Sequence, residues 1–407
     1  MRARIILVFV LLAALNLSAQ TFRGTILGTV TDPSGAVVAG AKVTVKNTGT
    51  GLERATETSG DGSYSLPELP IGTYDVTVTQ SGFQTFIARG VTVDVAAERR
   101  VDAGLKAGEV STRVEVSADQ LPLVETTTNT LGGVLTAQTV EDMPVNGRDY
   151  TKLIFLSPGV AGSPDQITDS PGSFGEFSMN GARGRSNNYL LDGTDMNDGY
   201  RNDPAINQAG VFGTPSTILP INAVAEVNVL SNFEPEYGRN AGAVVNIVTK
   251  SGTNAFHGTA AEYFRNNALD ARNYFNPADQ PEAPFHNNQF GGSLGGPIVK
   301  DKTFFFVDYE GQREKVGVVT VANVPNTGSG PNGQLAPQDS SNPVIQQLLA
   351  LNPWPAPNLP NGQASVISPS FNNLSSLIAK STRTSIQATS SLGATSSAIA
   401  LRLFRWR

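Results

Sequence analysis

Residues 236–252 read EYGRNAGAVVNIVTKSG, and this stretch decides the fold of the middle of the chain. Gly238 and Gly242 bracket a turn. The run that follows, residues 243–249, alternates and is rich in β-branched side chains, which is typical of a strand. Residues 226–230, EVNVL, lie a short distance upstream. This part of the chain is therefore expected to contain a strand over residues 243–249.

Further upstream, several short phrases follow one another in a fixed order. They are EDMPVNGRDY at 141–150, LSPGV at 156–160, MNGARG at 179–184 and NYLLDG at 188–193. Together with residues 226–252, this series resembles the plug domain of TonB-dependent outer-membrane receptors, in particular the Oar-like branch. The resemblance implies a small mixed α/β plug domain over residues 121–252 that fills the lumen of a barrel.

Three arginines of this segment, Arg148, Arg183 and Arg239, each stand next to a glycine. In a polar lumen they are candidates to pair with inward-facing carboxylates of the barrel. The alternative is that they are ordinary solvated arginines.

Residues 108–119 read GEVSTRVEVSAD, with valines alternating with polar residues as in an exposed strand. An exposed strand edge offers unpaired backbone groups to another protein. In the receptors named above, the TonB box lies just before the plug, and five residues resemble it: Val114, Glu115, Val116, Ser117 and Ala118. This resemblance implies a linker over 109–120 and the TonB complex as partner, although such pentapeptides are common.

Residues 20–108 read as short strands separated by turn residues. The strands are expected at 26–31, 42–46, 63–66, 74–79 and 91–95, with turns at DPSG (32–35), SGDG (59–62) and SG (81–82). About seven short strands in under 90 residues indicate an antiparallel sandwich. Each glycine of the motifs in this segment, from Gly28 to Gly82, is expected to permit a turn with positive φ.

The wording of this segment, from GTVTDPSG at 28–35 to SGF at 81–83, resembles the carboxypeptidase regulatory-like domain. That family is a transthyretin-like β-sandwich grouped with carbohydrate-binding-like folds, and it has no peptidase chemistry. The resemblance implies glycan contact, for which the segment shows no aromatic platform. Five side chains are expected in the core: Tyr64, Leu66, Tyr74, Val76 and Phe83.

After Gly252, strands are expected at 256–267, 288–298 and 302–311, with a loop or helical turn at 269–275. This succession resembles the first barrel strands of Oar-like receptors, and aromatic residues at strand ends suit the membrane interface. Residues 321–364 are rich in Pro, Asn and Gly, with a short helix expected at 344–351. Residues 253–365 are therefore interpreted as the first strands and a loop of an outer-membrane β-barrel.

A plugged transporter barrel has about 22 strands, each of roughly 10 residues. Only 155 residues follow Gly252, so the barrel is expected to be incomplete and the receptor truncated. From about Val366 the composition shifts to Ser, Thr and Ala. Residues 366–407 are interpreted as an aberrant low-complexity tail, either a flexible polar segment or a frameshift, because the neighbouring reading frame over 384–395 can encode a phrase like the next barrel strand.

The first nineteen residues contain Arg2 and Arg4, an apolar run at 5–15 and a small residue at Ala19. This arrangement is typical of a secretory signal peptide. With the resemblances above, it implies the outer membrane of a Gram-negative bacterium, with the periplasm as the alternative location for a truncated product.

Composition excludes several classes of protein. The chain has no cysteine and only two histidines, His257 and His286, which argues against metal centres and cysteine nucleophiles. A net charge of −6 argues against nucleic-acid binding. Ser293 lies in a G-x-S-x-G pattern, but no histidine follows it and no βαβ alternation surrounds it. No catalytic residue, metal or cofactor is expected.

The chain is thus expected to be mainly β: an N-terminal transthyretin-like sandwich, a small mixed α/β plug and the start of a barrel. The function implied is that of a TonB-dependent outer-membrane receptor and transporter, not an enzyme, with a ligand of the carbohydrate or peptide class. The alternative is a secreted or periplasmic module that binds glycan or protein without transport.

Overall fold

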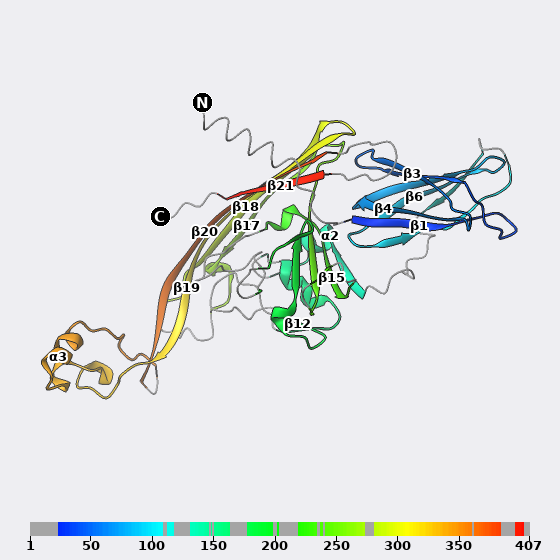
Figure 1. Ribbon diagram of the computed structural model, residues 1–407. Coiled ribbons are helices and arrows are strands. Elements are labelled where there is room, and N and C mark those ends of the chain that lie inside the picture. Colours follow the sequence, from blue (N-terminus) through cyan, green and yellow to red (C-terminus); the bar gives the residue numbers. More distant parts are fainter. Residues whose placement is uncertain are drawn as a thin grey trace, which may run out of the picture. The chain divides into compact units, whose positions relative to one another are not determined.

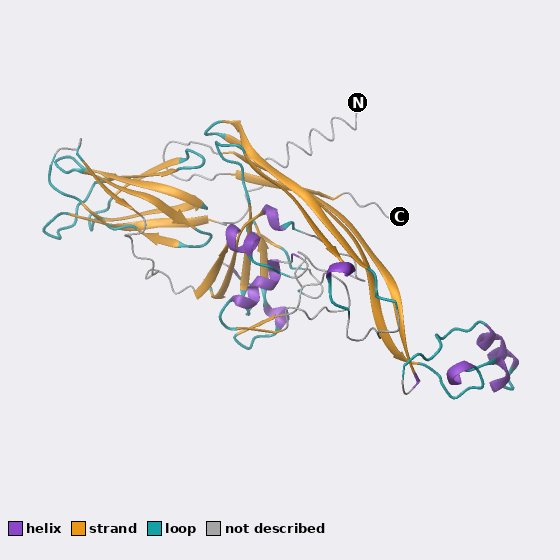
Figure 2. Cartoon of the chain, turned by 180° about the vertical axis from the view of Figure 1, so that it is seen from behind, coloured by secondary structure: helices purple, strands orange, loops and turns teal. Residues whose placement is uncertain are grey.

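The computed structural model describes most of the chain after residue 22. The described residues are 23–108, 112–117, 131–145, 148, 150–162, 177–197, 202, 219–233, 237–238, 241–272, 281–359, 362–383 and 395–402. The chain divides into two compact units. The first holds Met1–Thr259, Ser293–Asp308 and Ser376–Leu401, and the second holds Ala260–Gly292, Tyr309–Ser375 and Arg402–Arg407. Strands dominate throughout, which confirms the mainly β fold class (Figure 2).

The N-terminal domain is a β-sandwich of two sheets (Figure 1). One sheet has the order β4-β1-β7, with β8 also pairing with β1; the strands are β1 (Arg23–Thr31), β4 (Ser63–Pro70), β7 (Glu98–Arg100) and β8 (Ala103–Gly104). The other has the order β3-β2-β5-β6-β9, with β2 (Lys42–Asn47), β3 (Glu53–Glu57), β5 (Gly72–Thr79), β6 (Thr85–Val93) and β9 (Arg113–Ser117).

The core between these sheets follows the alternation in the sequence. Tyr64, Leu66, Tyr74 and Val76 are buried as expected, and Phe83 packs against the same cluster while half-buried. The strand over Glu53–Glu57 was not predicted, because its residues are charged or small and only every second one is half-buried. Charged residues on such a strand are typical of a sheet edge, where they discourage pairing with other chains.

The glycines of the sandwich have two different roles. Gly62 has a φ of 76° and makes the turn before β4, as the sequence predicted. The expectation that every glycine makes such a turn is wrong for Gly28, which lies inside β1. A Cβ atom there would lie 2.0 Å from the carbonyl oxygen of Val101 and 3.1 Å from the Tyr64 ring. The Tyr64 hydroxyl donates a 2.6 Å hydrogen bond to that same carbonyl, so Gly28 permits close backbone approach.

The middle domain is built on a five-stranded mixed sheet of order β10-β15-β16-β13-β14. Its strands are β10 (Leu131–Thr136), β13 (Asn188–Leu191), β14 (Thr194–Asp195), β15 (Val224–Asn232) and β16 (Val244–Thr249). Only the β13–β16 pair is parallel. A separate small hairpin joins β11 (Val160–Gly162) to β12 (Phe177–Met179).

Short helices accompany this sheet: α2 (Ala137–Asp142), η4 (Tyr150–Leu156), η5 (Gly184–Ser186) and η6 (Ile221–Ala223). Helix α2 begins after Thr136, whose side chain accepts a 3.3 Å hydrogen bond from the backbone N–H of Thr139. Val140 on α2 is fully buried in a core with Val227 and Val245 of the sheet. Phe306 and Ile378, from strands much later in the chain, belong to the same core.

A third sheet has the order β17-β18-β19-β20-β21, so each strand neighbours the next one along the chain. The strands are β17 (His257–Asn266), β18 (Phe285–Val299), β19 (Thr303–Asn323), β20 (Gln363–Arg383) and β21 (Thr395–Arg402). The first three agree with the expected strands. The boundary expected at residue 366 does not appear: β20 runs continuously across it. The Ser- and Thr-rich composition hid this strand, although its β-branched and aromatic residues, such as Val366, Ile367 and Phe371, suit a pleated surface.

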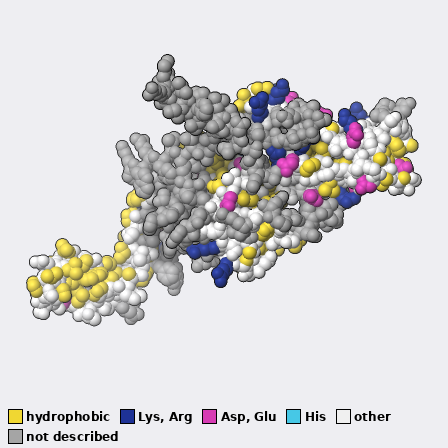
Figure 3. Space-filling model, viewed as in Figure 1, with side chains coloured by type: hydrophobic (Ala, Val, Ile, Leu, Met, Phe, Trp, Pro, Cys, Tyr) yellow, Lys and Arg dark blue, Asp and Glu magenta, His cyan; other side chains and the backbone are white. Residues whose placement is uncertain are grey.

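A long connection between β19 and β20 contains the 3-10 turns η9 (Pro331–Gly333) and η10 (Pro337–Asp339) and the helix α3 (Pro343–Ala350). The helix agrees with the predicted one, and Asn342 caps it by accepting a 2.9 Å hydrogen bond from Val344 N. Apolar side chains gather on this connection (Figure 3), among them Val344, 71% exposed, and Leu351, 77% exposed. Within the described residues, no helix is both long enough and apolar enough to cross a membrane.

Candidate functional site

The segment predicted to bind a partner is not a free linker in the structure. Residues Arg113–Ser117 form β9, which lies parallel to β6 at the end of the second sandwich sheet. Thr85 is opposite Arg113, and the register continues to Arg89 opposite Ser117. The backbone N–H of Thr85 also donates to the Thr112 carbonyl at 2.9 Å. The expected exposed strand is thus present, but it is an added strand of the N-terminal domain.

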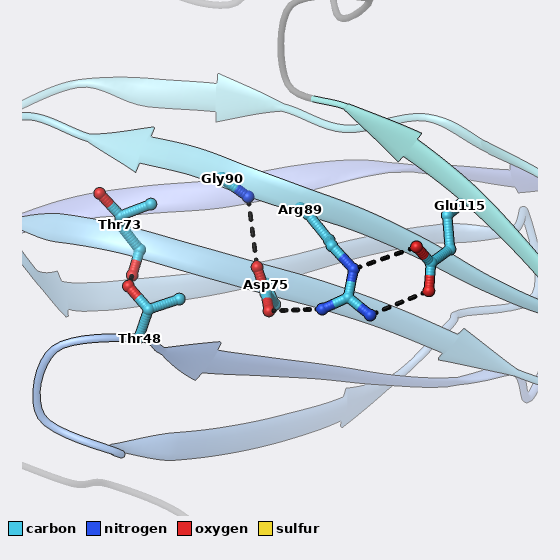
Figure 4. Close-up of polar contacts among 6 residues, drawn as sticks. All are labelled: Thr48, Thr73, Asp75, Arg89, Gly90 and Glu115. Atoms are coloured by element: carbon cyan, nitrogen blue, oxygen red, sulfur yellow. Dashed lines mark hydrogen bonds and ion pairs between the residues drawn. The ribbon is translucent and has the colours of Figure 1, made fainter.

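An ionic cluster ties this strand to its neighbours (Figure 4). The Arg89 guanidinium on β6 donates to both carboxylate oxygens of Glu115 on β9, at 2.9 and 3.3 Å. Its third nitrogen lies 3.4 Å from Asp75 on β5, and Asp75 also accepts from Gly90 N at 3.2 Å. The hydrogen bonds and positive charge of Arg89 hold the pKa of the Glu115 carboxyl below its ordinary value. One arginine therefore joins three adjacent strands.

Apolar burial contributes less to the position of β9. Every second residue is exposed, and only Val114 and Val116 are half-buried. Val116 packs against the sandwich core. Ala118, the last residue of the candidate TonB box, lies outside the described residues. The box is thus held mainly by backbone pairing and by Glu115.

The three arginines expected to meet barrel carboxylates lie in different surroundings. Arg148 is half-buried, and its guanidinium donates to the Asn222 side chain at 3.5 Å. Arg183 is exposed and directly precedes η5. Arg239 lies outside the described residues. Pairing of these arginines with barrel carboxylates stays a prediction.

One ion pair links the middle domain to a strand of the third sheet. Here the middle domain supplies the carboxylate, Asp192, and the strand supplies the cation, Lys380. Asp192 and Gly193 form a two-residue turn between β13 and β14, with φ values of 47° and 77°. Asp-Gly is the preferred pair for such a hairpin turn. The turn directs the Asp192 carboxylate at β16, where it accepts from Thr249 N at 3.0 Å and from Thr249 Oγ1 at 2.5 Å.

Lys380 on β20 completes this cluster. Its ammonium group donates to Asp192 Oδ1 at 3.2 Å, to Thr249 O at 3.0 Å and to Thr249 Oγ1 at 2.9 Å. The Lys380 side chain is only 2% exposed, and that of Asp192 is 11% exposed. All three donors of the ammonium group thus have acceptors, the condition under which a buried lysine is tolerated.

Sequence reasoning missed this cluster. The Asp-Gly pair was a recognisable hairpin signal, but Lys380 lies in the stretch interpreted as an aberrant tail. A lysine directly after three apolar residues, in Leu377-Ile378-Ala379-Lys380, was the available signal. Its inward position follows only once this stretch is known to be a strand.

Glu226 on β15 is a second buried charged residue of the middle domain. It is 6% exposed, and its carboxylate accepts a 2.5 Å hydrogen bond from the backbone N–H of Val95. Asn228, two residues along the strand, donates to Val95 O at 2.9 Å. Burial raises the pKa of Glu226 to about 7, and the nearby charge of Asp94 acts in the same direction.

Replacing Glu226 with Gln is expected to flatten the pH dependence of stability. The folded-state pKa of about 7 lies above the ordinary 4.5, so the native state favours the protonated carboxyl. Its stabilising contribution is complete below pH 4.5 and is lost as the pH rises through 7, an effect on the order of 3 kcal/mol. Thermal unfolding of the detergent-solubilised chain across this range measures it. An unchanged slope in the variant would contradict the assignment, and Glu57→Gln on the exposed face of β3 is the control.

The G-x-S-x-G pattern lies in a different structural context from that of a hydrolase. Ser293 lies within β18, which continues to Val299, and its hydroxyl lies 2.8 Å from that of Thr259. A nucleophile of that kind requires a sharp turn between a strand and a helix. Among the described residues, no group of three or more His, Asp or Glu side chains is placed to hold a metal ion.

Comparison with known proteins identifies two segments of the chain. Residues 25–106 match the model of the carboxypeptidase regulatory-like domain. Residues 248–399 match the model of an outer membrane beta barrel domain, and this match includes β20 and its Lys380. The barrel match supports an outer-membrane location.

Two curated proteins are similar to the chain. The TonB-dependent transporter Oar of Myxococcus xanthus is 28% identical over 301 residues, covering 70% of this chain and 26% of that protein. The probable TonB-dependent siderophore receptor PirA of Acinetobacter baumannii is 28% identical over 172 residues, covering 41% of this chain and 21% of that protein. The predicted resemblance to TonB-dependent receptors of the Oar-like type is thereby confirmed.

The chain spans about a quarter of the length of the curated relatives it matches. The crystal structure of PirA is also similar, at 17% identity, covering 66% of this chain and 43% of that chain. The TM-score of this match is 0.31.

Proposed function

We propose that this chain belongs to a receptor that binds a ligand at the cell surface and imports it with energy relayed by the TonB complex. The reason is that the chain is a homologue of the TonB-dependent outer-membrane receptors. The observation that carries the proposal is the order of parts in one chain. A regulatory-like sandwich, a mixed sheet with short helices and a segment of the outer membrane barrel family follow each other, as the similarity to Oar over 301 residues indicates.

The contact between Asp192 and Lys380 supports the assignment of residues 121–252 as the plug. It joins the middle domain to a strand of the barrel-family segment through a buried ion pair with complete hydrogen bonding. Phe306 and Ile378, also from that segment, complete the apolar core of the middle domain. A plug that packs against the inner face of barrel strands requires both buried ion pairs and apolar contacts with those strands.

The location is tested by fractionation of Gram-negative cells that express the chain with its first nineteen residues. Recovery in the outer membrane, in a form that resists heat denaturation in detergent, is the expected result. A soluble periplasmic product would instead favour the alternative function, a binding module for glycan or protein that performs no transport.

The proposed partner segment is tested by Val116→Pro. Proline removes the backbone N–H of residue 116 and cannot take part in strand pairing. Binding of the purified chain to an immobilised TonB periplasmic domain is expected to fall at least about tenfold, because strand addition depends on main-chain hydrogen bonds. The matched control Val116→Ala keeps the backbone donor and is expected to bind within about twofold of the wild type. Equal binding by the proline variant would rule out residues 114–118 as the contact.

A further inference from the structure

The strand that carries the candidate TonB box has only one neighbour among the described strands. It pairs with β6 over five positions, from Arg113 to Ser117, in the parallel direction. Parallel pairs are slightly less stable per residue than antiparallel ones. A five-residue edge strand with every second side chain exposed belongs to the least stable class of native elements, the class that opens locally without global unfolding.

The position of β9 is nevertheless specific. Arg89 on β6 binds Glu115 through two nitrogens and Asp75 on β5 through a third (Figure 4). Because the side-chain period of a strand is two, a shift of one residue would turn Glu115 to the other face and break both of its hydrogen bonds. Val116 would then also leave the sandwich core. The pairing therefore has one defined register. It is held by the ion pair between Arg89 and Glu115, whose side chains are both half-exposed.

We propose that the N-terminal sandwich is a docking site for the box segment and that the edge of β6 and the TonB complex compete for residues 113–117. While the segment is docked, half of its backbone N–H and C=O groups face β6, and Glu115 is held by Arg89. A partner that pairs through that edge can bind only after β9 has left β6. The sandwich thereby keeps the receptor uncoupled until the segment is released. This inference rests on the proposed role of the box.

Docking itself is measured by hydrogen exchange of the peptide containing residues 113–117 in the detergent-solubilised chain. Arg89→Ala is expected to raise exchange there roughly two- to fivefold, the effect of losing one half-exposed ionic contact. The control Arg100→Ala removes a similar exposed pair, Arg100 with Asp102 at 2.9 Å on the other sheet, and is expected to leave this peptide unchanged. Exchange of residues 113–117 at the rate of an unstructured peptide in the wild type would overturn the docking.

Competition is measured with a disulfide. The chain has no cysteine, so introduced thiols have no other partner. Thr85→Cys with Arg113→Cys joins opposite residues of β6 and β9, whose strands lie about 4.8 Å apart, within the range of a disulfide. The pair leaves Arg89 and Glu115 intact. Lys42→Cys with Thr79→Cys, opposite residues of β2 and β5, is the matched control because it staples the sandwich without β9.

Binding to the immobilised TonB periplasmic domain then decides between the outcomes. The oxidised Thr85–Arg113 variant is expected to bind at least about tenfold more weakly, with recovery after reduction, while the control pair is unaffected. Undiminished binding by the oxidised variant would overturn the competition, because the partner would then use the outer edge of a docked β9. If the wild type binds no better than Val116→Pro, the proposed role of the box is wrong, and the proposed competition is wrong with it. The hydrogen-exchange experiment still decides whether residues 113–117 dock on the sandwich.

Discussion

Asp192→Ala is expected to destabilise the middle domain by about 3–5 kcal/mol, because it removes the carboxylate from a buried ion pair with the Lys380 ammonium group. The Lys380 side chain is 2% exposed, and its contacts with Thr249 are to carbonyl and hydroxyl oxygens, which carry no charge. The backbone N–H and the hydroxyl of Thr249 lose their acceptor in the same variant. The effect is expected first in β16, as faster hydrogen exchange of the peptide over residues 244–250.

Two further variants separate the buried charge from simple loss of contact. Asp192→Ala combined with Lys380→Met removes both charges and is expected to recover much of the loss, because a buried pair and an apolar replacement are often similar in stability. Asp102→Ala breaks the exposed pair with Arg100 and is expected to change stability by less than about 1 kcal/mol. A loss of similar size for Asp102→Ala and Asp192→Ala would show that Lys380 is not buried as described.

Gly28→Ala is expected to destabilise the N-terminal sandwich by about 3 kcal/mol or more. Inserting an extra carbon group into a packed core usually costs about 1–3 kcal/mol, so this loss lies at or above the top of that range. The added methyl group would lie 2.0 Å from the Val101 carbonyl oxygen, a backbone atom that cannot move without breaking the pairing of β1. Displacing this carbonyl also removes the acceptor of the buried Tyr64 hydroxyl. Limited proteolysis and hydrogen exchange of residues 23–31 in the full chain measure the loss.

Gly104→Ala is the matched control for this prediction. Gly104 lies on β8, next to β1, and no heavy atom lies within 4 Å of the position that its Cβ would take. Near wild-type exchange is therefore expected. If Gly28→Ala also exchanged like the wild type, the close approach between β1 and Val101 would not exist in solution.

The sequence pattern predicted the strands and the helix whose own residues favour that structure. The strand at Lys42–Asn47 follows from alternation, and the fully buried strand at Val244–Thr249 follows from its β-branched residues. The helix at Pro343–Ala350 follows from an Asn-Pro start. The strand over Gln363–Arg383 was missed because Ser- and Thr-rich composition is also typical of flexible segments. Its identity depends on neighbours in the sheet rather than on its own residues.

The candidate site was predictable in its residues but not in its contacts. Val114 to Ser117 were recognised as a strand, yet nothing in them specifies parallel pairing with residues 85–89, about 28 positions earlier. The partner of Glu115 was unpredictable for the same reason, since Arg89 belongs to another strand. Asp192 and Lys380 are 188 residues apart, and only the folded topology brings them together.

That separation has a consequence for the order in which the chain assembles. Asp192 meets Thr249 across 57 residues, so these bonds close a short loop and form within one domain. The bond to Lys380 closes a loop more than three times as long and must wait for β20 to be synthesised, exported and paired. Until then the Asp192 carboxylate stays hydrated, and the middle domain remains open on that side. Arrival of Lys380 converts a hydrated carboxylate site into a buried one, so β20, a strand late in the chain, closes a sheet that lies earlier in it.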